Sequence, residues 1–381
     1  MPREYIMSTI MHTHVLVVGA GPAGIAAAIT LQKLGIDHLL VDKATFPREK
    51  LCAGLFTAKG QETLCQLVGT ESAEGCMSAS LAARQSNLVF WNGQQHITSV
   101  PLVEDIVLVH RPQMDAWLVQ HYQGLGGAPR LGDALVGLDV AAHIATLASG
   151  AQIRYDYLVG ADGANSRVRR LVRPDEKRPK ILACEVNLPR QACPMLHANI
   201  HFDIVPRTYA WVFDKGDSVC IGMSQMPGVD IDLKMVFRHF LADVGVDFPS
   251  QVTIHGAIIP YDVRPTYSLG DGILLAGDAA GTVEPMTLEG ISYALESGQR
   301  VAQAIASGTV ADLKPRPLGN GHFVQNHLLE KRWFLNLFYR HAPRHTRFMA
   351  RFYDEYINHH PHTSVPRMAL MLLGKAVKNM I

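Results

Sequence analysis

The stretch HVLVVGAGPAGIAAAITLQKLGIDHLLVDK, residues 14–43, decides the fold of this chain. Residues 14–18 form a nearly continuous apolar run, as expected of a strand that is buried on both faces. Residues 23–34 are rich in Ala, Ile and Leu and predict a helix, which Gly35 ends. Residues 38–42, HLLVD, predict a second strand that returns parallel to the first. The stretch therefore predicts a β-α-β unit.

Between the first strand and the helix, Gly19, Gly21 and Gly24 follow G-x-G-x-x-G spacing. The first glycine permits a tight turn, the second lets the backbone approach a pyrophosphate, and the third lets helix and strand pack closely. The helix N-terminus offers N–H donors to phosphate oxygens. Asp42 ends the second strand, where a carboxylate accepts hydrogen bonds from ribose hydroxyls and repels a 2′-phosphate, so FAD or NAD is favoured over NADP. The residues predicted to contact this dinucleotide are Gly19, Gly21, Pro22, Ala23, Gly24, Asp42 and Lys43.

Composition narrows the class of protein. The 381 residues include 35 Lys+Arg and 34 Asp+Glu, a formal net charge of +1, which argues against a nucleic-acid partner. The hydrophobic share is 48% and the charged share 18%. This balance is consistent with an apolar substrate or a membrane surface, and equally with a large α/β core.

The cysteines and histidines give no metal-binding pattern. The six cysteines lack CxxC spacing, and reduced thiols in a cytoplasmic protein are predicted. The histidines of HHPH, residues 359–362, have no carboxylate or cysteine at ligand spacing, so no metal is predicted. No signal peptide is predicted at the N-terminus, and no stretch approaches the ~20 apolar residues that span a bilayer.

A second motif lies in GILLAGDAAGTVEPMTLEGISYALESG, residues 272–298. It resembles the second FAD signature of flavoproteins with the fold of the aromatic hydroxylases. The resemblance implies that Asp278 binds the ribityl chain, and that a helix beginning near Leu288 directs its N-terminus at the pyrimidine edge of the flavin. Reduced flavin is negatively charged there, and a helix N-terminus stabilises an anion. The FAD contacts implied here are Gly277, Asp278, Ala279, Pro285, Glu289, Gly290 and Ile291.

A third motif, DYLVGADGANSRVRR at residues 156–170, resembles the DG motif of the same superfamily. It implies FAD contacts by Asp162 and Gly163. In HRPQMDAWL, Arg111 matches an arginine that contacts FAD in relatives, although a simple surface charge is the alternative. Since all three motifs occur in the order of the superfamily, across residues 13–310, they predict FAD as the cofactor.

Two further segments resemble the geranylgeranyl reductase family, flavoenzymes that saturate isoprenoid double bonds. FPREKLCAGL, residues 46–55, is similar to its PREKPCGG segment, and YAWVFDKGDSVCIGMS, residues 209–224, is similar to its Tyr-x-Trp-x-Phe segment. TLEGISYALESG is similar to TGEGIxxALxSG of that family. The resemblance implies FAD contacts by Arg48, Cys52, Ala53 and Gly54, and substrate contacts by Tyr209, Trp211 and Phe213.

The chain departs from the pattern of this family at five positions. Leu51 and Asp214 replace prolines, and Ala53, Ser224 and Leu288 replace glycines. These changes affect the predicted shape of the pocket over the flavin, and therefore the substrate, more than they affect the cofactor.

The resemblance places Cys52 near the flavin, where two roles are open. A thiol there would donate a proton to the carbon next to the one that receives a hydride, which makes Cys52 the candidate catalytic residue. Alternatively, Cys52 only shapes the pocket, since free cysteine often behaves as a small buried hydrophobe. Tyr209 and Trp211 are likewise either core or pocket residues.

The predicted fold class is α/β (mixed α+β). A Rossmann-like FAD-binding domain of the glutathione-reductase and aromatic-hydroxylase type is interleaved with a β-rich substrate domain. Helices are predicted over 57–67, 111–123, 233–244 and 288–306, and a hairpin is predicted across Asn92-Gly93. The predicted segments are 13–78, 105–178 and 265–312 for the FAD-binding domain, 79–104 and 179–264 for the substrate domain, and 317–381 for a C-terminal helical region.

The predicted function is FAD-dependent reduction of C=C bonds in an isoprenoid or similar small apolar substrate, lipids included. One alternative is an FAD-dependent monooxygenase of the aromatic-hydroxylase type, which shares the three FAD motifs but does not need the cysteine segment. A second is a redox or electron-transfer flavoprotein, which would lack an apolar pocket beside the flavin. The chain has one G-x-G-x-x-G, so the electron donor is predicted to be transiently bound NAD(P)H or a ferredoxin-like protein. A cytoplasmic location is predicted, with peripheral membrane contact through the basic C-terminal helices as an alternative.

Overall fold

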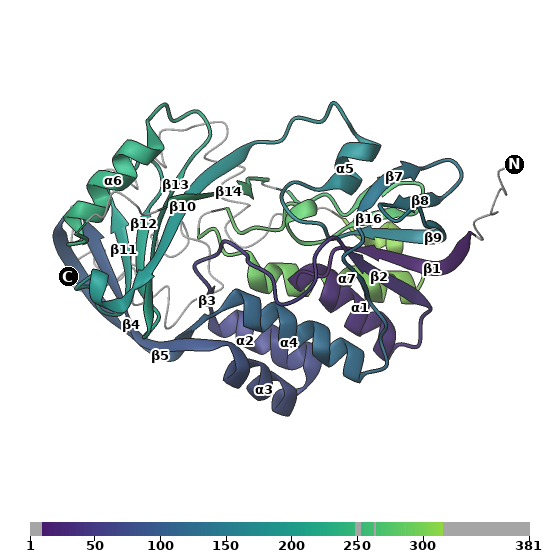
Figure 1. The fold of residues 1–381 in the computed structure, drawn as a ribbon, viewed down its shortest axis with the longest axis horizontal. Helices are drawn as coiled ribbons and strands as arrows, with labels where there is room; N and C mark the ends of the chain where they lie inside the picture. Colours follow the sequence, from purple (N-terminus) through teal and green to yellow (C-terminus); the bar gives the residue numbers. More distant parts are fainter. Residues whose placement is uncertain (1–9, 248–252, 263, 286, 315–381) are drawn as a thin grey trace, which may run out of the picture.

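Two β-sheets form the framework of the protein (Figure 1). The computed structural model describes residues 10–247, 253–262, 264–285 and 287–314. The predicted C-terminal helical region, 317–381, and the basic surface expected of it lie outside the described residues. None of the helices in the described part of the chain has both the length and the apolarity needed to cross a membrane.

The first sheet contains the β-α-β unit that the glycine motif predicted. Its strand order is β15-β16-β9-β1-β2-β6, and β7 and β8 pair beside β9. The central strands β16, β9, β1 and β2 are parallel, with Val18 opposite both Val41 and Gly160. The strands are β1 (Met11–Val18), β2 (His38–Asp42), β6 (Arg130–Leu131), β7 (Leu135–Asp139), β8 (Ile144–Leu147), β9 (Gln152–Gly160), β15 (Ser268–Gly270) and β16 (Ile273–Leu275).

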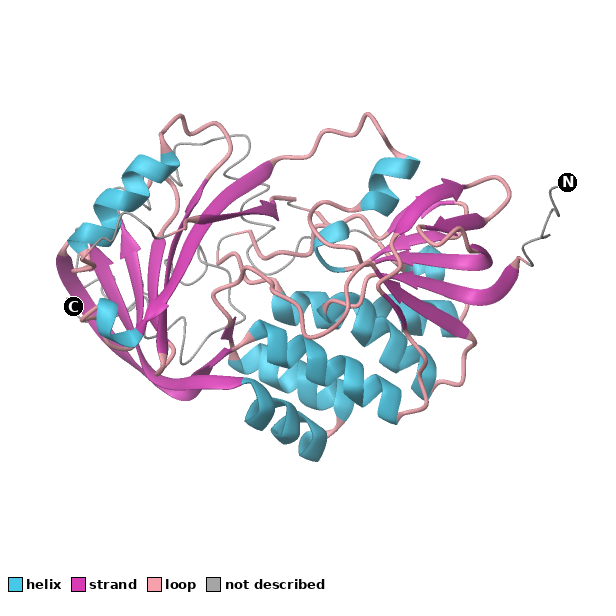
Figure 2. Ribbon diagram, in the orientation of Figure 1, coloured by secondary structure: helices cyan, strands magenta, loops and turns pink. Residues whose placement is uncertain are grey.

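Helices α1 (Pro22–Lys33) and α7 (Ile291–Ala306) pack together beside this sheet, and α2, α3 and α4 extend the helical layer (Figures 1 and 2). In α1 every residue from Ala23 to Leu31 is buried, because the sheet, α7 and α4 surround the helix. A Cβ atom on Gly298 of α7 would lie 2.0 Å from the Ala23 carbonyl oxygen. The contact between these two helices therefore requires a glycine at position 298.

The other helices are α2 (Ala58–Val68), α3 (Thr70–Ser80), α4 (Arg111–Gly124), α5 (Arg167–Val172) and α6 (Leu233–Asp243). α2, α4 and α6 lie where the sequence predicted helices. α3 was not predicted, because TESAEGCMSAS has few large apolar residues and little helical periodicity. The helix predicted from about Leu288 to Ala306 begins three residues later, at Ile291, and is α7. Backbone bonds from Glu284 N–H to Glu289 O (2.9 Å) and from Leu288 N–H to Glu284 O (2.9 Å) hold the preceding residues in a closed loop.

The second sheet has the order β14-β10-β13-β12-β11-β4-β5-β3. β4 and β5 form the predicted hairpin, with Gly93 in the left-handed region at φ 58°. α6 packs on one face of this sheet, and the other face is directed at the first sheet (Figure 1). The strands are β3 (Leu55–Phe56), β4 (Leu81–Asn92), β5 (Gln95–Val109), β10 (Lys180–Pro189), β11 (Ala198–Phe202), β12 (Ala210–Asp214), β13 (Ser218–Gln225) and β14 (His255–Pro260).

The predicted fold class, a mixed α/β protein with a Rossmann-like sheet and a second β-rich unit, is confirmed. The chain passes from one sheet to the other several times, as the strand numbers show. The exact residue boundaries between the FAD-binding and substrate segments stay a prediction.

Candidate active site

A single cavity of about 1810 Å³ extends from the glycine turn of the first sheet to the inward face of the second. Sites for one ligand usually enclose about 300–1,000 Å³, so this cavity has room for a cofactor and a substrate together. Among the predicted site residues, those that line it are Gly19, Gly21, Pro22, Ala23, Asp42, Lys43, Arg48, Cys52, Ala53, Gly54, Arg111, Asp162, Gly163, Tyr209, Trp211, Phe213, Gly277, Asp278, Glu289, Gly290 and Ile291. Gly24, Ala279 and Pro285 are buried and do not line it.

The glycine turn is built from close backbone contacts. Gly19 has φ +107°, and a Cβ atom there would lie 2.5 Å from the Ala161 carbonyl oxygen. A Cβ atom on Gly24 would lie 1.7 Å from the Gly19 carbonyl oxygen. Gly21 is the N-cap of α1 and no side chain caps the helix, so its first N–H groups remain available to an anion. This cradle fits the pyrophosphate of a dinucleotide.

The side chain of Asp42 stabilises the same turn by hydrogen bonds. Its Oδ2 accepts the Ala20 N–H at 2.6 Å, and its Oδ1 accepts the Ala44 N–H at 2.7 Å. Each carboxylate oxygen can accept more than one hydrogen bond. The two backbone contacts therefore leave Asp42 able to accept bonds from sugar hydroxyls, as the sequence predicted.

One carboxylate oxygen of Asp162 is hydrogen-bonded and the other is not. Its Oδ2 accepts N–H groups from Arg167 (2.5 Å) and Val168 (3.0 Å) at the start of α5. Its Oδ1 is buried and has no hydrogen-bond partner among the described residues. Burial raises the pKa of Asp162, against the effect of these hydrogen bonds. A hydroxyl group of a bound cofactor would satisfy this atom, which supports the fit of FAD to the cavity.

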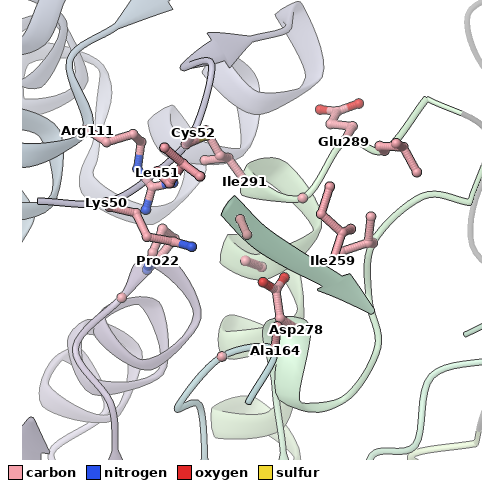
Figure 3. Close-up of a pocket in the computed structure, with 18 of the residues that line it drawn as sticks. Pro22, Lys50, Leu51, Cys52, Arg111, Ala164, Ile259, Asp278, Glu289 and Ile291 are labelled. Carbon is pink, nitrogen blue, oxygen red and sulfur yellow. The ribbon is translucent and has the colours of Figure 1, made fainter. Parts of the chain in front are cut away.

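Asp278 and Lys50 point into the cavity from opposite sides (Figure 3). Burial raises the pKa of Asp278, and the positive charges of Lys50, Arg111 and Arg178 oppose that shift. Two arginines hold the turn that carries Asp278. The Ala279 carbonyl accepts hydrogen bonds from Arg169 Nη1 at 2.9 Å and from Arg178 at 3.4 Å.

Arg111 is buried rather than a surface charge. It forms two hydrogen bonds with Asp115, at 3.0 and 2.9 Å, and lies beside Cys52 (Figure 3). Burial acts to lower the pKa of Arg111, but Asp115 and Cys52 outweigh it and raise the pKa. The Cys52 sulfur also accepts the Gly54 N–H at 3.4 Å. Cys52 is therefore held in a half-buried, electropositive position on the cavity wall.

The inward face of the second sheet forms an apolar wall of the cavity. Trp211 lies flat on the sheet because Gly222, opposite it, has no side chain: a Cβ there would be 2.3 Å from the indole ring. Tyr209 joins this wall to the loop before α7, since its hydroxyl donates to the Thr287 carbonyl. The apolar wall consists of Leu88, Phe90, Leu102, Ile200, Phe202, Trp211, Phe213 and Ile259.

The sequence revealed neither the contacts of Glu289 nor the presence of Glu185 in the cavity wall. Glu289 accepts from the Thr57 hydroxyl at 2.7 Å and from the Ser292 hydroxyl, so it ties α2 to the start of α7. Glu185 of β10 lines the cavity and was not among the predicted site residues. Its one signal in the sequence is an acid within the largely apolar strand KILACEVNLP.

Leu288 lines the cavity in a left-handed backbone conformation, at φ 58°. This conformation costs a residue with a Cβ atom about 1–2 kcal/mol, and glycine almost nothing. Leu288→Gly is therefore expected to be about 1 kcal/mol more stable than Leu288→Ala, which loses the same side-chain contacts but keeps the strain. Urea unfolding of the two variants measures the difference. An alanine variant that is the more stable of the two would contradict the left-handed geometry.

Comparisons with known proteins show which proteins this chain is similar to. Residues 12–191 match the family model described as FAD binding domain. The chain is 31% identical over 322 residues to digeranylgeranylglycerophospholipid reductase 1 of Methanopyrus kandleri, covering 78% of this chain and 80% of that one. It is 28% identical over 360 residues to geranylgeranyl diphosphate reductase of Rhodobacter capsulatus, covering 89% and 87%.

The fold is similar to that of a geranylgeranyl bacteriochlorophyll reductase-like protein of Thermoplasma acidophilum. The TM-score is 0.73 at 17% identity, and the match covers 97% of this chain and 99% of the other. The FAD-binding match, the two reductase relatives and the cavity geometry lead to one conclusion. The chain belongs to the geranylgeranyl reductase family of FAD-dependent oxidoreductases.

Proposed function

We propose that this protein reduces C=C bonds of an isoprenoid or a similar apolar substrate. One observation carries the proposal: the FAD motifs and the apolar wall line the same cavity. An electron-transfer flavoprotein would not need such a wall. The names of the two relatives, both reductases of geranylgeranyl compounds, support the same substrate class.

In this proposal bound FAD, in its reduced form, supplies the hydride. The cradle of Gly19, Gly21 and the α1 N-terminus holds the pyrophosphate, and Asp42, Asp162 and Asp278 accept hydrogen bonds from cofactor hydroxyls. The apolar wall orients the substrate chain and excludes water from the reacting bond. The electron donor is NAD(P)H or a ferredoxin-like protein, and the lipid character of the substrate favours peripheral contact with a membrane.

Cys52 is the proposed proton donor. Cys52→Ala is expected to lower turnover at saturating substrate by about 100-fold, since a positioned acid contributes about 10²–10⁴ in rate. KM should change little, because the thiol contributes little to the apolar contact area. Cys65→Ala, which removes a half-buried thiol outside the cavity lining, is the matched control. Full turnover by Cys52→Ala would leave this residue with a role in shaping the pocket only.

The test of the function itself uses the FAD-loaded protein without oxygen. The flavin is reduced chemically, a geranylgeranyl lipid is added, and flavin reoxidation is followed together with the mass of the product. Reoxidation with a gain of two hydrogens supports the reductase. No reaction with the lipid, combined with oxygen-dependent insertion of one oxygen atom into an aromatic substrate, would favour the monooxygenase instead.

A further inference from the structure

Glu185 is a buried acid on the apolar wall. It is 3% exposed and lies in a row of residues that pair across β12, β13, β10 and β14: Trp211, Gly222, Glu185 and His255. Gly222 has no side chain, and the Trp211 ring occupies the space above it, next to Glu185 in the row. A carboxyl group in such surroundings is costly to keep charged and needs specific partners.

The partners of Glu185 come from the loop that carries Lys50 and Cys52, and from β13 and the turn before it. Its Oε1 accepts the Cys52 backbone N–H at 3.0 Å, although the two residues are 133 positions apart. The carboxyl thus contacts the backbone of the residue whose thiol is the proposed proton donor. The Cys220 thiol and the charges of Lys215 and Lys50 also act on Glu185.

These surroundings determine the protonation state of the carboxyl. Burial raises the pKa of Glu185, while Lys215, Lys50 and the hydrogen bonds from Cys52 and Cys220 oppose the shift. His255 pairs with Glu185 across the edge strand β14 and is exposed, and Cys184, the preceding residue, is buried. Burial therefore favours the neutral acid relative to an exposed glutamate, and the two lysines favour the carboxylate.

We propose that Glu185 stores a proton beside Cys52 and returns it to the Cys52 sulfur after that sulfur has given its own proton to the substrate. This inference rests on the proposed function. In the first transfer the S–H bond breaks, the sulfur keeps the electron pair as a thiolate, and the proton goes to the substrate carbon. In the second, the Glu185 O–H bond breaks, the proton goes to the thiolate, and the carboxylate remains beside Lys215 and Lys50. Water then reprotonates Glu185, so the step needs no oxidant or reductant of its own.

The first test asks whether Glu185 carries a proton, with infrared spectra of the full-length, FAD-loaded protein at neutral pH. Asp162 and Asp278 also have raised pKa values, so the spectrum of Glu185→Gln is subtracted from that of the wild type. The difference is expected to contain the band of one protonated carboxyl that shifts in D2O. Asp156→Asn, at a half-exposed acid whose pKa is lowered by hydrogen bonds from His14 and His12, is the matched control and should give no such band. Absence of the band in the Glu185 difference overturns the proposal.

The second test asks whether the carboxyl acts on Cys52. Alkylation by iodoacetamide is followed against pH and assigned to individual cysteines by mass spectrometry, with half-buried Cys65 as an internal control. Glu185→Gln keeps an oxygen for the Cys52 N–H but cannot ionise. Its Cys52 alkylation midpoint is expected about one pH unit below that of the wild type, because the neighbouring carboxylate no longer opposes the thiolate. Cys65 should not shift.

Equal Cys52 midpoints in the two proteins, or a parallel shift of Cys65, overturn the proposal. Neither test uses a substrate. Failure of lipid reduction would therefore count against the proposed function. Failure of these two readouts would contradict the role of Glu185 but not the proposed reductase activity.

Discussion

Gly298→Ala is expected to destabilise the protein by about 3 kcal/mol and to abolish FAD binding at micromolar cofactor. The added Cβ would lie 2.0 Å from the Ala23 carbonyl oxygen and 3.1 Å from the Ala26 Cβ, so α7 must move away from α1. Ala23 belongs to the first turn of α1, whose N–H groups form the proposed pyrophosphate cradle. Urea unfolding of the apoprotein and flavin fluorescence titration measure the two effects.

Gly75→Ala is the matched control, because Gly75 also lies within a helix. A Cβ atom at position 75 would meet Trp117 at 3.5 Å, which is an ordinary contact. The higher helix propensity of alanine should therefore determine the change in stability, and we expect the variant to be more stable by up to about 1 kcal/mol. Two glycine-to-alanine changes in helices are thus expected to have opposite signs. If Gly298→Ala were also stabilising, the close packing of α1 on α7 would be wrong.

The second large effect concerns acid stability and His201. This side chain is 3% exposed, stacks on Trp91 with ring centroids 5.6 Å apart, and meets Phe240 edge-on at 5.0 Å. Its Nδ1 donates to the Gly93 carbonyl at 3.3 Å, and its Nε2 is buried without a partner among the described residues. Burial lowers the pKa of His201 to about 4 from 6.5, and the bond to Gly93 only partly opposes this.

The unfolded chain therefore binds a proton at position 201 at higher pH than the folded protein does. At neutral pH the histidine is uncharged in both states and has no pH effect. As the pH falls from about 6.5 to about 4, the unfolded state gains the proton first, and the contribution to stability falls by up to about 3 kcal/mol.

His201→Phe keeps an aromatic ring in the stack but cannot bind a proton. The free energy of unfolding of wild type and variant, measured from pH 7 to pH 4, is expected to change in favour of the variant by about 3 kcal/mol across that range. Contributions of other acids and bases cancel in the difference. Parallel curves for the two proteins would show that His201 is accessible to protons in the folded state.

The fold was predictable because its central unit depends on local rules. Glycine spacing, an apolar strand and an alanine-rich helix specify β1, α1 and β2 without reference to the rest of the chain. The start of α7 was predicted three residues too early. Backbone hydrogen bonds of Glu284 close the preceding loop, and no residue pattern in that loop predicts them.

The candidate site was predictable where a motif marks it, and less so where contact depends on tertiary structure. Asp162 and Asp278, whose motifs predict contacts with FAD, line the cavity, whereas Ala279 and Pro285 lie outside its lining. Glu185 was missed because its partner, Cys52, lies in a loop before β3, 133 positions away in the chain. Gly298 lies within a family motif, but its contact with Ala23 depends on how two helices cross.

The alternation of the chain between the two sheets has a consequence for biosynthesis. β16 joins β9 in the first sheet, and β14 joins β10 in the second, so both sheets need residues beyond position 254. The central contact of α1 is with α7, which is synthesised later still. A nascent chain therefore has no complete sheet until most of it has left the ribosome, and contacts between distant residues make folding slow. Until then, the apolar wall lacks its opposite side, and such exposed apolar surface favours aggregation.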